Sequence, residues 1–136
     1  MKSNRLWNHV FHFKAVYNWL TPVLVLFLIP PQGDRLYFHL FLALAFVFGF
    51  GYWWAGNDPI NNRKIIFMGV AGQGAVFVIS FLHGLGRPID FETIAQTGAG
   101  LVDGTFSVLF AVFLYQARKV RANPAHSIAN LEKGEI

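Results

Sequence analysis

The sequence contains no cysteine and few charged residues. Its 136 residues include no Cys, and 13% are Asp, Glu, Lys or Arg. The lack of Cys excludes disulfide bonds, thiol catalysis and thiolate metal sites. The charged fraction is about half of the roughly 25% found in soluble domains. Gly-x-Ser-x-Gly, His-Glu-x-x-His and phosphate-loop motifs are also absent, so the sequence carries no signature of a serine hydrolase, a zinc protease or a P-loop enzyme.

Apolar and aromatic residues make up most of the chain. It is 54% hydrophobic, with 15 Phe, 4 Trp and 4 Tyr, a composition that suits a lipid-facing surface with aromatic belts. The formal net charge of +4 is also compatible with a nucleic-acid partner. The basic residues, however, lie beside the apolar runs, where an anionic membrane surface explains them. We therefore expect the lipid bilayer as a partner, and no nucleic acid.

Four apolar runs organise the chain, at residues 15–30, 36–55, 65–86 and 93–116. Each can cross a bilayer with small shifts at its ends. None alternates with period two, so helices rather than barrel strands are expected. The short connections make neighbouring helices antiparallel. The sequence therefore predicts an all-α polytopic membrane protein, a single up-down bundle of four transmembrane helices.

The basic residues are divided unequally between the two sides of this predicted bundle. Two of them, Arg35 and Arg87, fall on one side. Nine fall on the other, namely Lys2, Arg5, Lys14, Arg63, Lys64, Arg118, Lys119, Arg121 and Lys133. Because positive charge accumulates in cytoplasmic segments, both termini are predicted to be cytoplasmic. Lys14 and Asn18 are expected at the inner interface, with Lys14 snorkelling to the headgroups.

The two ends of the chain carry weaker signals. Residues 1–14 are amphipathic, so they are predicted to lie in the interface plane; a cytoplasmic extension of the first helix is the equally supported alternative. The exit of the first run, LIPPQGD, lacks a small-x-small cleavage site, so that run is expected to be retained. Residues 122–136 have little periodicity and are expected to form a loosely ordered cytoplasmic tail.

Asp103 lies near the middle of the fourth apolar run. A carboxylate there costs about 2.5–3.5 kcal/mol on insertion scales, so it normally faces the protein interior. Residues at three- and four-residue steps share one helical face. The predicted polar seam comprises Gln96, Gly100, Asp103, Ser107 and Ala111, and the matching stripe on the third helix comprises Gly69, Gln73, Val76, Ser80 and His83. The predicted lipid face of the fourth helix comprises Leu101, Val102, Phe106, Leu109 and Phe113.

Gln73 and Asp103 are predicted to lie at similar depth and to form a hydrogen bond. Small residues would let the third and fourth helices approach closely there; they are Gly69, Gly72, Gly74, Gly98, Gly100 and Gly104. Three roles for Asp103 stay open: pinning two helices together, serving as a ligand or proton site, and contacting another subunit.

Two histidines are predicted at matched depth in the outer half of the bundle. His39 and His83, with Gln96, would form a funnel leading towards Asp103. The two imidazoles could ligate haem b; the alternative is that both bond to loop carbonyls or headgroups. No third clear ligand accompanies them, so no structural metal site is predicted.

Short motifs spread over the second to fourth predicted helices resemble a known group. Gly51-Tyr52-Trp53-Trp54-Ala55, Asp58-Pro59, Arg63 and Gly69-Val70-Ala71-Gly72, followed by an Asp on the last helix, resemble small bacterial inner-membrane proteins grouped as DoxX-like. The resemblance implies a four-helix fold in a bacterial inner membrane. Such proteins often carry Lys after the second glycine, where this chain has Gln73, so a Lys–Asp pair would be replaced by Gln–Asp.

Two functions fit these observations best. The first is an accessory or interaction subunit of a larger membrane complex or a homo-oligomer, favoured by small size and sparse chemistry. The alternative is a binder or enzyme for a lipophilic molecule, such as a quinone, isoprenoid or lipid, with Asp103 and His83 as acid and base. A transporter is less favoured, because no inverted repeat is evident. The candidate ligand-binding residues are Asp103, Gln73, His39, His83, Gln96 and Ser107.

Overall fold

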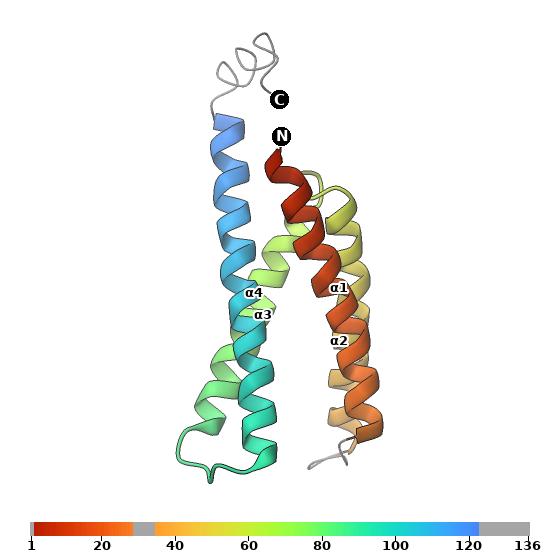
Figure 1. The fold of residues 1–136 in the computed structure, drawn as a ribbon, viewed down its shortest axis with the longest axis vertical. Coiled ribbons are helices and arrows are strands. Elements are labelled where there is room, and N and C mark those ends of the chain that lie inside the picture. The colour runs from red at the N-terminus through yellow and green to blue at the C-terminus, as the bar shows by residue number, and fades with distance from the viewer. Residues whose placement is uncertain (1, 29–34, 123–136) are drawn as a thin grey trace. The chain divides into compact units, whose positions relative to one another are not determined.

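Four α-helices account for the regular structure of the described residues. The computed structural model describes residues 2–28 and 35–122. In chain order, the helices are α1 (Lys2–Leu28), α2 (Arg35–Asn57), α3 (Arg63–Gly84) and α4 (Phe91–Ala122) (Figure 1). Each contains a segment long and apolar enough to cross a membrane, and no strand occurs within these ranges. The chain is thus an all-α, multi-pass membrane protein, as the sequence predicts.

The helices extend beyond the apolar runs that predicted them. α1 begins at Lys2 rather than at residue 15, so residues 2–14 continue the first helix, which is the alternative considered for that segment. α4 continues to Ala122, past the predicted end at residue 116. Hydropathy marks only the most apolar part of a helix, whereas backbone hydrogen bonding continues through the polar residues that flank it. The predicted tail, from residue 123 onward, lies outside the described residues.

The chain divides into two compact units. The first contains α1, α2 and the start of α3, and the second contains the rest of α3 and α4. α1 and α2 lie side by side in the first unit (Figure 1). α3 and α4 touch each other along a stripe in the second unit.

Glycines on α2 allow α1 to approach its backbone. A side chain on Gly49 would collide with the indole of Trp19 and would lie 3.1 Å from the Ala15 carbonyl oxygen; one on Gly56 would collide with the His12 ring. The two glycines are seven residues apart, so they occupy the same face of α2 two turns apart. Aromatic contacts fill the edge of this interface, at centroid distances of 4.5 Å for His12–Trp53, 5.2 Å for Trp19–Phe50 and 5.6 Å for Trp19–Trp53.

Small residues also form the contact between α3 and α4. It pairs Gly74 with Ser107, Phe77 with Gly104, Ser80 with Gly100 and Gly84 with Thr97. Numbers rise on α3 as they fall on α4, so the helices are antiparallel. The expectation that all the predicted glycines serve this contact was wrong for Gly72 and Gly98, because no described atom lies within 4 Å of a side chain built on either.

Both described loops are held by side-chain hydrogen bonds. The Asp58 carboxylate accepts bonds from the backbone N–H and the side-chain amide of Asn61, at 3.1 and 2.6 Å. The side-chain bond is the main cause that holds the pKa of Asp58 below its ordinary value. Asn62 donates to the Trp54 and Asp58 carbonyls. Asn62 therefore caps the end of α2.

Asp90 caps the N-terminus of α4. Its carboxylate accepts the backbone N–H of Thr93 at 2.8 Å, which is the usual geometry of an N-cap. That bond, together with a side-chain bond from Thr93, holds the pKa of Asp90 below the ordinary 3.8. Since the folded pKa is lowered, the charged cap stabilises α4 above about pH 3.8, and this stabilisation is lost as the pH falls through the folded value.

The Asp90 cap is testable by NMR. In detergent micelles, the chemical shift of the Thr93 amide should change with the protonation of the Asp90 carboxyl group, and the midpoint pH of this change should be below 3.8. Asp90→Asn should abolish this titration and still protect the Thr93 amide from hydrogen exchange, because an Asn side chain also caps helices. A midpoint at or above 3.8 would contradict the assignment.

The glycine contact between α1 and α2 predicts an asymmetric response to added methyl groups. Gly49→Ala should lower the free energy of unfolding by about 1–3 kcal/mol, because the methyl overpacks against Trp19 and the Ala15 carbonyl. Gly98→Ala, the control, meets open space and should leave stability unchanged or slightly higher. Unfolding in mixed SDS and detergent micelles measures both, and equal effects of the two substitutions would refute the packing.

Candidate functional site

Two polar residues of α1 are buried, against expectation. Lys14 is 1% exposed, within the candidate membrane span Arg5–Leu28. Its Nζ lies 4.4 Å from the centroid of the Tyr17 ring, a cation–π contact. The prediction that Lys14 snorkels to headgroups is therefore wrong for this side chain. Lys14 follows the buried Phe11 by three residues and precedes the buried Asn18 by four, so it shares their inward face.

Asn18 ties α1 to α2. Its side-chain amide donates to the Ala45 carbonyl at 2.9 Å. The next turn of α1 holds Pro22, which has no N–H to donate to the Asn18 carbonyl. In lipid, hydrogen bonds between neighbouring helices contribute to helix pairing. Asn18, predicted to lie at the membrane interface, thus acts in helix pairing.

Ser107 ties α3 to α4 in the second unit. Its hydroxyl donates to the Val70 carbonyl at 2.8 Å, and it also lies beside Gly74. Ser107 belongs to the predicted polar seam, and the structure shows that its hydroxyl is engaged in holding two helices together. Thr105, on the same helix, instead donates to the Leu101 carbonyl of its own helix at 2.9 Å.

Gln73 and Asp103 lie about one helical turn apart along the α3–α4 pair. The Ser107–Val70 and Ser107–Gly74 contacts place Gln73 at the level of Ser107, whereas Phe77 is level with residues near Asp103. Gln73 is 6% exposed, and Asp103 is half-buried. The predicted hydrogen bond between the two side chains stays a prediction.

The face of α3 that contacts α4 differs from the predicted polar stripe. Val70, Gly74, Phe77 and Gly84 make the contact together with Ser80, the one predicted member. Gly74 follows Gln73 by one residue, a rotation of about 100° around the helix. Polarity alone places Gln73 and His83 on the facing side, whereas close packing selects the smaller residues beside them. Gln73 stays buried at the edge of the contact, and His83 is exposed.

The lipid face predicted for α4 also needs correction. Phe106 and Phe113 are 7% and 3% exposed, so they are covered by protein rather than available to lipid. Leu101 is exposed as predicted. A large aromatic side chain and a lipid-facing side chain have the same hydropathy, so the sequence alone does not separate them.

The predicted outer funnel is divided between the two units. His39 is on α2, whereas His83 and Gln96 are on α3 and α4. Gly84 on α3 contacts Thr97 on α4, so the neighbouring His83 is level with Thr97 and not with Asp103. At 1.5 Å per residue, the two levels are about 9 Å apart along the helix axis. The funnel, the acid–base pair and the haem ligation by His39 and His83 stay predictions.

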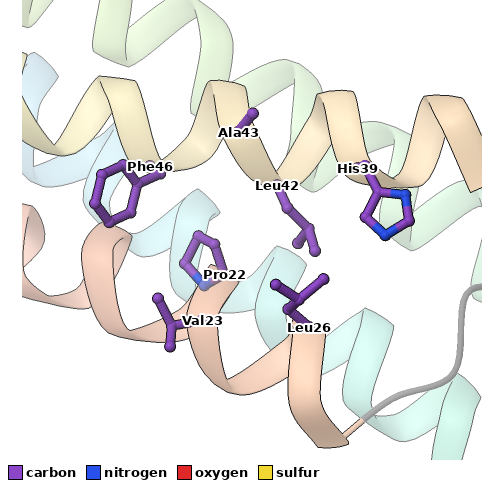
Figure 2. A pocket seen from close by; sticks show the side chains of 7 residues that line it. All are labelled: Pro22, Val23, Leu26, His39, Leu42, Ala43 and Phe46. Carbon is purple, nitrogen blue, oxygen red and sulfur yellow. The ribbon is translucent and has the colours of Figure 1, made fainter.

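A groove lies between α1 and α2, beside His39. It has a volume of about 220 Å³ and is lined by Pro22, Val23 and Leu26 of α1 and by His39, Leu42, Ala43 and Phe46 of α2 (Figure 2). No group of three or more His, Cys, Asp or Glu side chains able to hold a metal occurs among the described residues. Because its described lining is apolar apart from His39, the groove is a candidate site for an apolar molecule.

Comparisons with known proteins add no relative. No protein-family model, curated protein or solved structure matches the chain. The resemblance to DoxX-like proteins therefore stays a prediction from the short motifs.

The Ser107 bond predicts a specific loss of helix pairing. Ser107→Ala should lower the free energy of unfolding by about 0.6 kcal/mol and by no more than about 1.7, the measured range for hydrogen bonds between membrane helices. Thr105→Ala is the matched control, because Thr105 bonds within its own helix. Steric trapping in bicelles would measure both; an equal or larger loss for Thr105→Ala would contradict the role of Ser107.

Proposed function

We propose that this chain is an accessory or interaction subunit of a larger membrane assembly or of a homo-oligomer. The observation that carries the proposal is an open small-residue position on α3. Gly72 is exposed, and no described atom lies within 4 Å of a side chain built on it. Glycines of this kind let another membrane helix approach closely.

The residues around Gly72 form a continuous exposed face. Met68, Gly72, Ala75 and Ile79 follow one another at three- and four-residue steps, and all four are exposed. They therefore form one stripe, with the glycine and alanine between two large apolar side chains. A partner helix would gain van der Waals contact with Met68 and Ile79 while its backbone approached Gly72.

The use of polar side chains within the spans supports the same conclusion. Asn18 and Ser107 both donate to a carbonyl of the neighbouring helix. These bonds stabilise the pairs and leave neither donor group available for chemistry. A scaffold needs such internal bonds, whereas an enzyme also needs reactive groups gathered in one place.

Location and orientation belong to the same proposal. We place the chain in a bacterial inner membrane with both termini in the cytoplasm. The charge distribution supports this orientation even without the buried Lys14, because Arg63 and Lys64 lie at the start of α3 and Arg118 lies near the end of α4. Arg35 and Arg87 alone are on the opposite side.

The alternative is an enzyme or binder that uses Asp103 on a lipophilic substrate. The half-buried Asp103 in the span Gln96–Arg118 supports it, because an ionisable residue there is costly. The displacement of His83 along α3 removes support from His83 as its acid–base partner. We therefore rank this function second.

The accessory role is tested by substituting Gly72. The wild-type chain, extracted from native membranes in a mild detergent, should migrate well above its own 15.3 kDa after the detergent contribution is subtracted. Gly72→Leu should shift most of the chain to the single-chain position, because the larger side chain holds a partner helix away. Size-exclusion chromatography with light scattering measures both masses.

Val78→Leu provides the control, since Val78 is exposed and lies off the Gly72 stripe; it should leave the assembly intact. Far-UV circular dichroism of the purified chains should show the same helix content for both variants, which separates loss of a partner from loss of fold. A wild-type chain that migrates only as a single copy would refute the proposal.

A further inference from the structure

The groove between α1 and α2 has one polar end. His39 lies at one end and Phe46 at the other, with Pro22, Val23 and Leu26 along the α1 side (Figure 2). Among the described residues that line the groove, His39 alone has a polar side chain. The hollow exists because Ala43 is short and the Pro22 side chain is a compact ring, so neither side chain reaches across to fill it.

The hydrogen bonding of His39 fixes what its ring presents. Nδ1 lies 2.7 Å from the Arg35 carbonyl oxygen. A carbonyl can only accept, so in the neutral imidazole Nδ1 carries the proton and Nε2 is left as an acceptor. Figure 2 shows the second ring nitrogen on the side of the ring away from the α2 backbone. The groove therefore complements a group that donates a hydrogen bond.

The direction of the groove matches the orientation of a lipid in one leaflet. α2 enters its candidate span at Arg35, so His39 is about 6 Å, or one turn, from the level of the headgroups. Phe46 is about 10 Å further along the helix. A molecule lying in the groove would have its polar end near the membrane surface and its chain towards the interior.

We propose that this groove binds an uncharged lipid alcohol, with the hydroxyl donating to His39 Nε2 and the hydrocarbon running towards Phe46. None of the described lining residues has a charged side chain, so none of them offers a partner to a phosphate or a carboxylate. Its volume of about 220 Å³ is below the roughly 300–1,000 Å³ of sites that enclose drug-sized ligands. It therefore takes the hydroxyl end and the first part of the chain, and the rest lies against the helices. The proposal is independent of the Gly72 face, which belongs to the other unit.

The probe is hexadecanol with a diazirine in its chain, and the control probe is the methyl ether of the same molecule. The full-length protein is placed in phospholipid nanodiscs, irradiated and mapped by peptide mass spectrometry. The alcohol should label residues 22–26 and 42–46 about threefold to tenfold more than the ether, since the ether has lost the donor of one hydrogen bond. Equal labelling by the two probes would overturn the proposal and leave an ordinary lipid-facing surface.

Variants of His39 test the acceptor directly. His39→Leu should reduce alcohol labelling to the level of the ether, whereas His39→Gln, which keeps an accepting oxygen, should retain most of it. His83→Leu replaces an exposed histidine of the other unit and should change nothing. Unchanged labelling of a folded His39→Leu protein would overturn the proposal.

Competition identifies the source of the alcohol. Unlabelled farnesol stands for isoprenoid alcohols and dioleoylglycerol for glycerolipids. Displacement of the hexadecanol probe by either one supports the site and names the class. Failure of both to displace it at large excess would count against a lipid-alcohol site. Ala43→Phe, which fills the hollow, should abolish labelling by the alcohol, and labelling that persisted would also contradict the site.

Discussion

Close contact between helix backbones at glycine is the constraint on which both units depend. In a bilayer, association of helices cannot rely on burying apolar surface, because the lipid is equally apolar. Pairing therefore depends on how near the backbones come and on the polar bonds that this nearness permits. Gly49 and Gly56 bring α1 to α2, and Gly100 and Gly104 bring α4 to α3. The Asn18 and Ser107 hydrogen bonds each reach a carbonyl of the adjacent helix only because of this approach.

This constraint also explains which residues are left for function. Polar groups near a glycine contact are engaged in holding helices, as Ser107 is. Groups away from those contacts keep a free lone pair or an open face. His39 is one turn into α2, where the α1–α2 pair encloses a groove rather than a tight contact. Gly72 is on the side of α3 away from Gly74, and it meets no described atom. The two proposals therefore rest on the places where close packing stops.

The sequence predicts the elements of this structure better than their rotation. Runs of apolar residues locate all four helices, because crossing a membrane needs length and hydropathy, and both are local properties. The length of α1 at its beginning and of α4 at its end was underestimated, since backbone hydrogen bonding continues through polar residues that lower the local hydropathy. Rotation depends on the partner helix, so polarity placed His83 on the contact face of α3 and Phe113 towards lipid, whereas packing excludes both assignments. Lys14 was missed for the same reason: nothing local distinguishes an enclosed lysine from one at the headgroups.

The burial of Lys14 has a consequence for how the chain enters the membrane. A cation enclosed by protein is tolerable only after the residues that enclose it have folded around it. When α1 first leaves the ribosome, its later neighbours do not yet exist, and the ammonium group must stay with water and headgroups. The enclosure of Lys14 therefore depends on residues that follow α1 in the chain, and it is complete only after they are made. The final seating of the first helix in this protein thus waits for the helices synthesised after it.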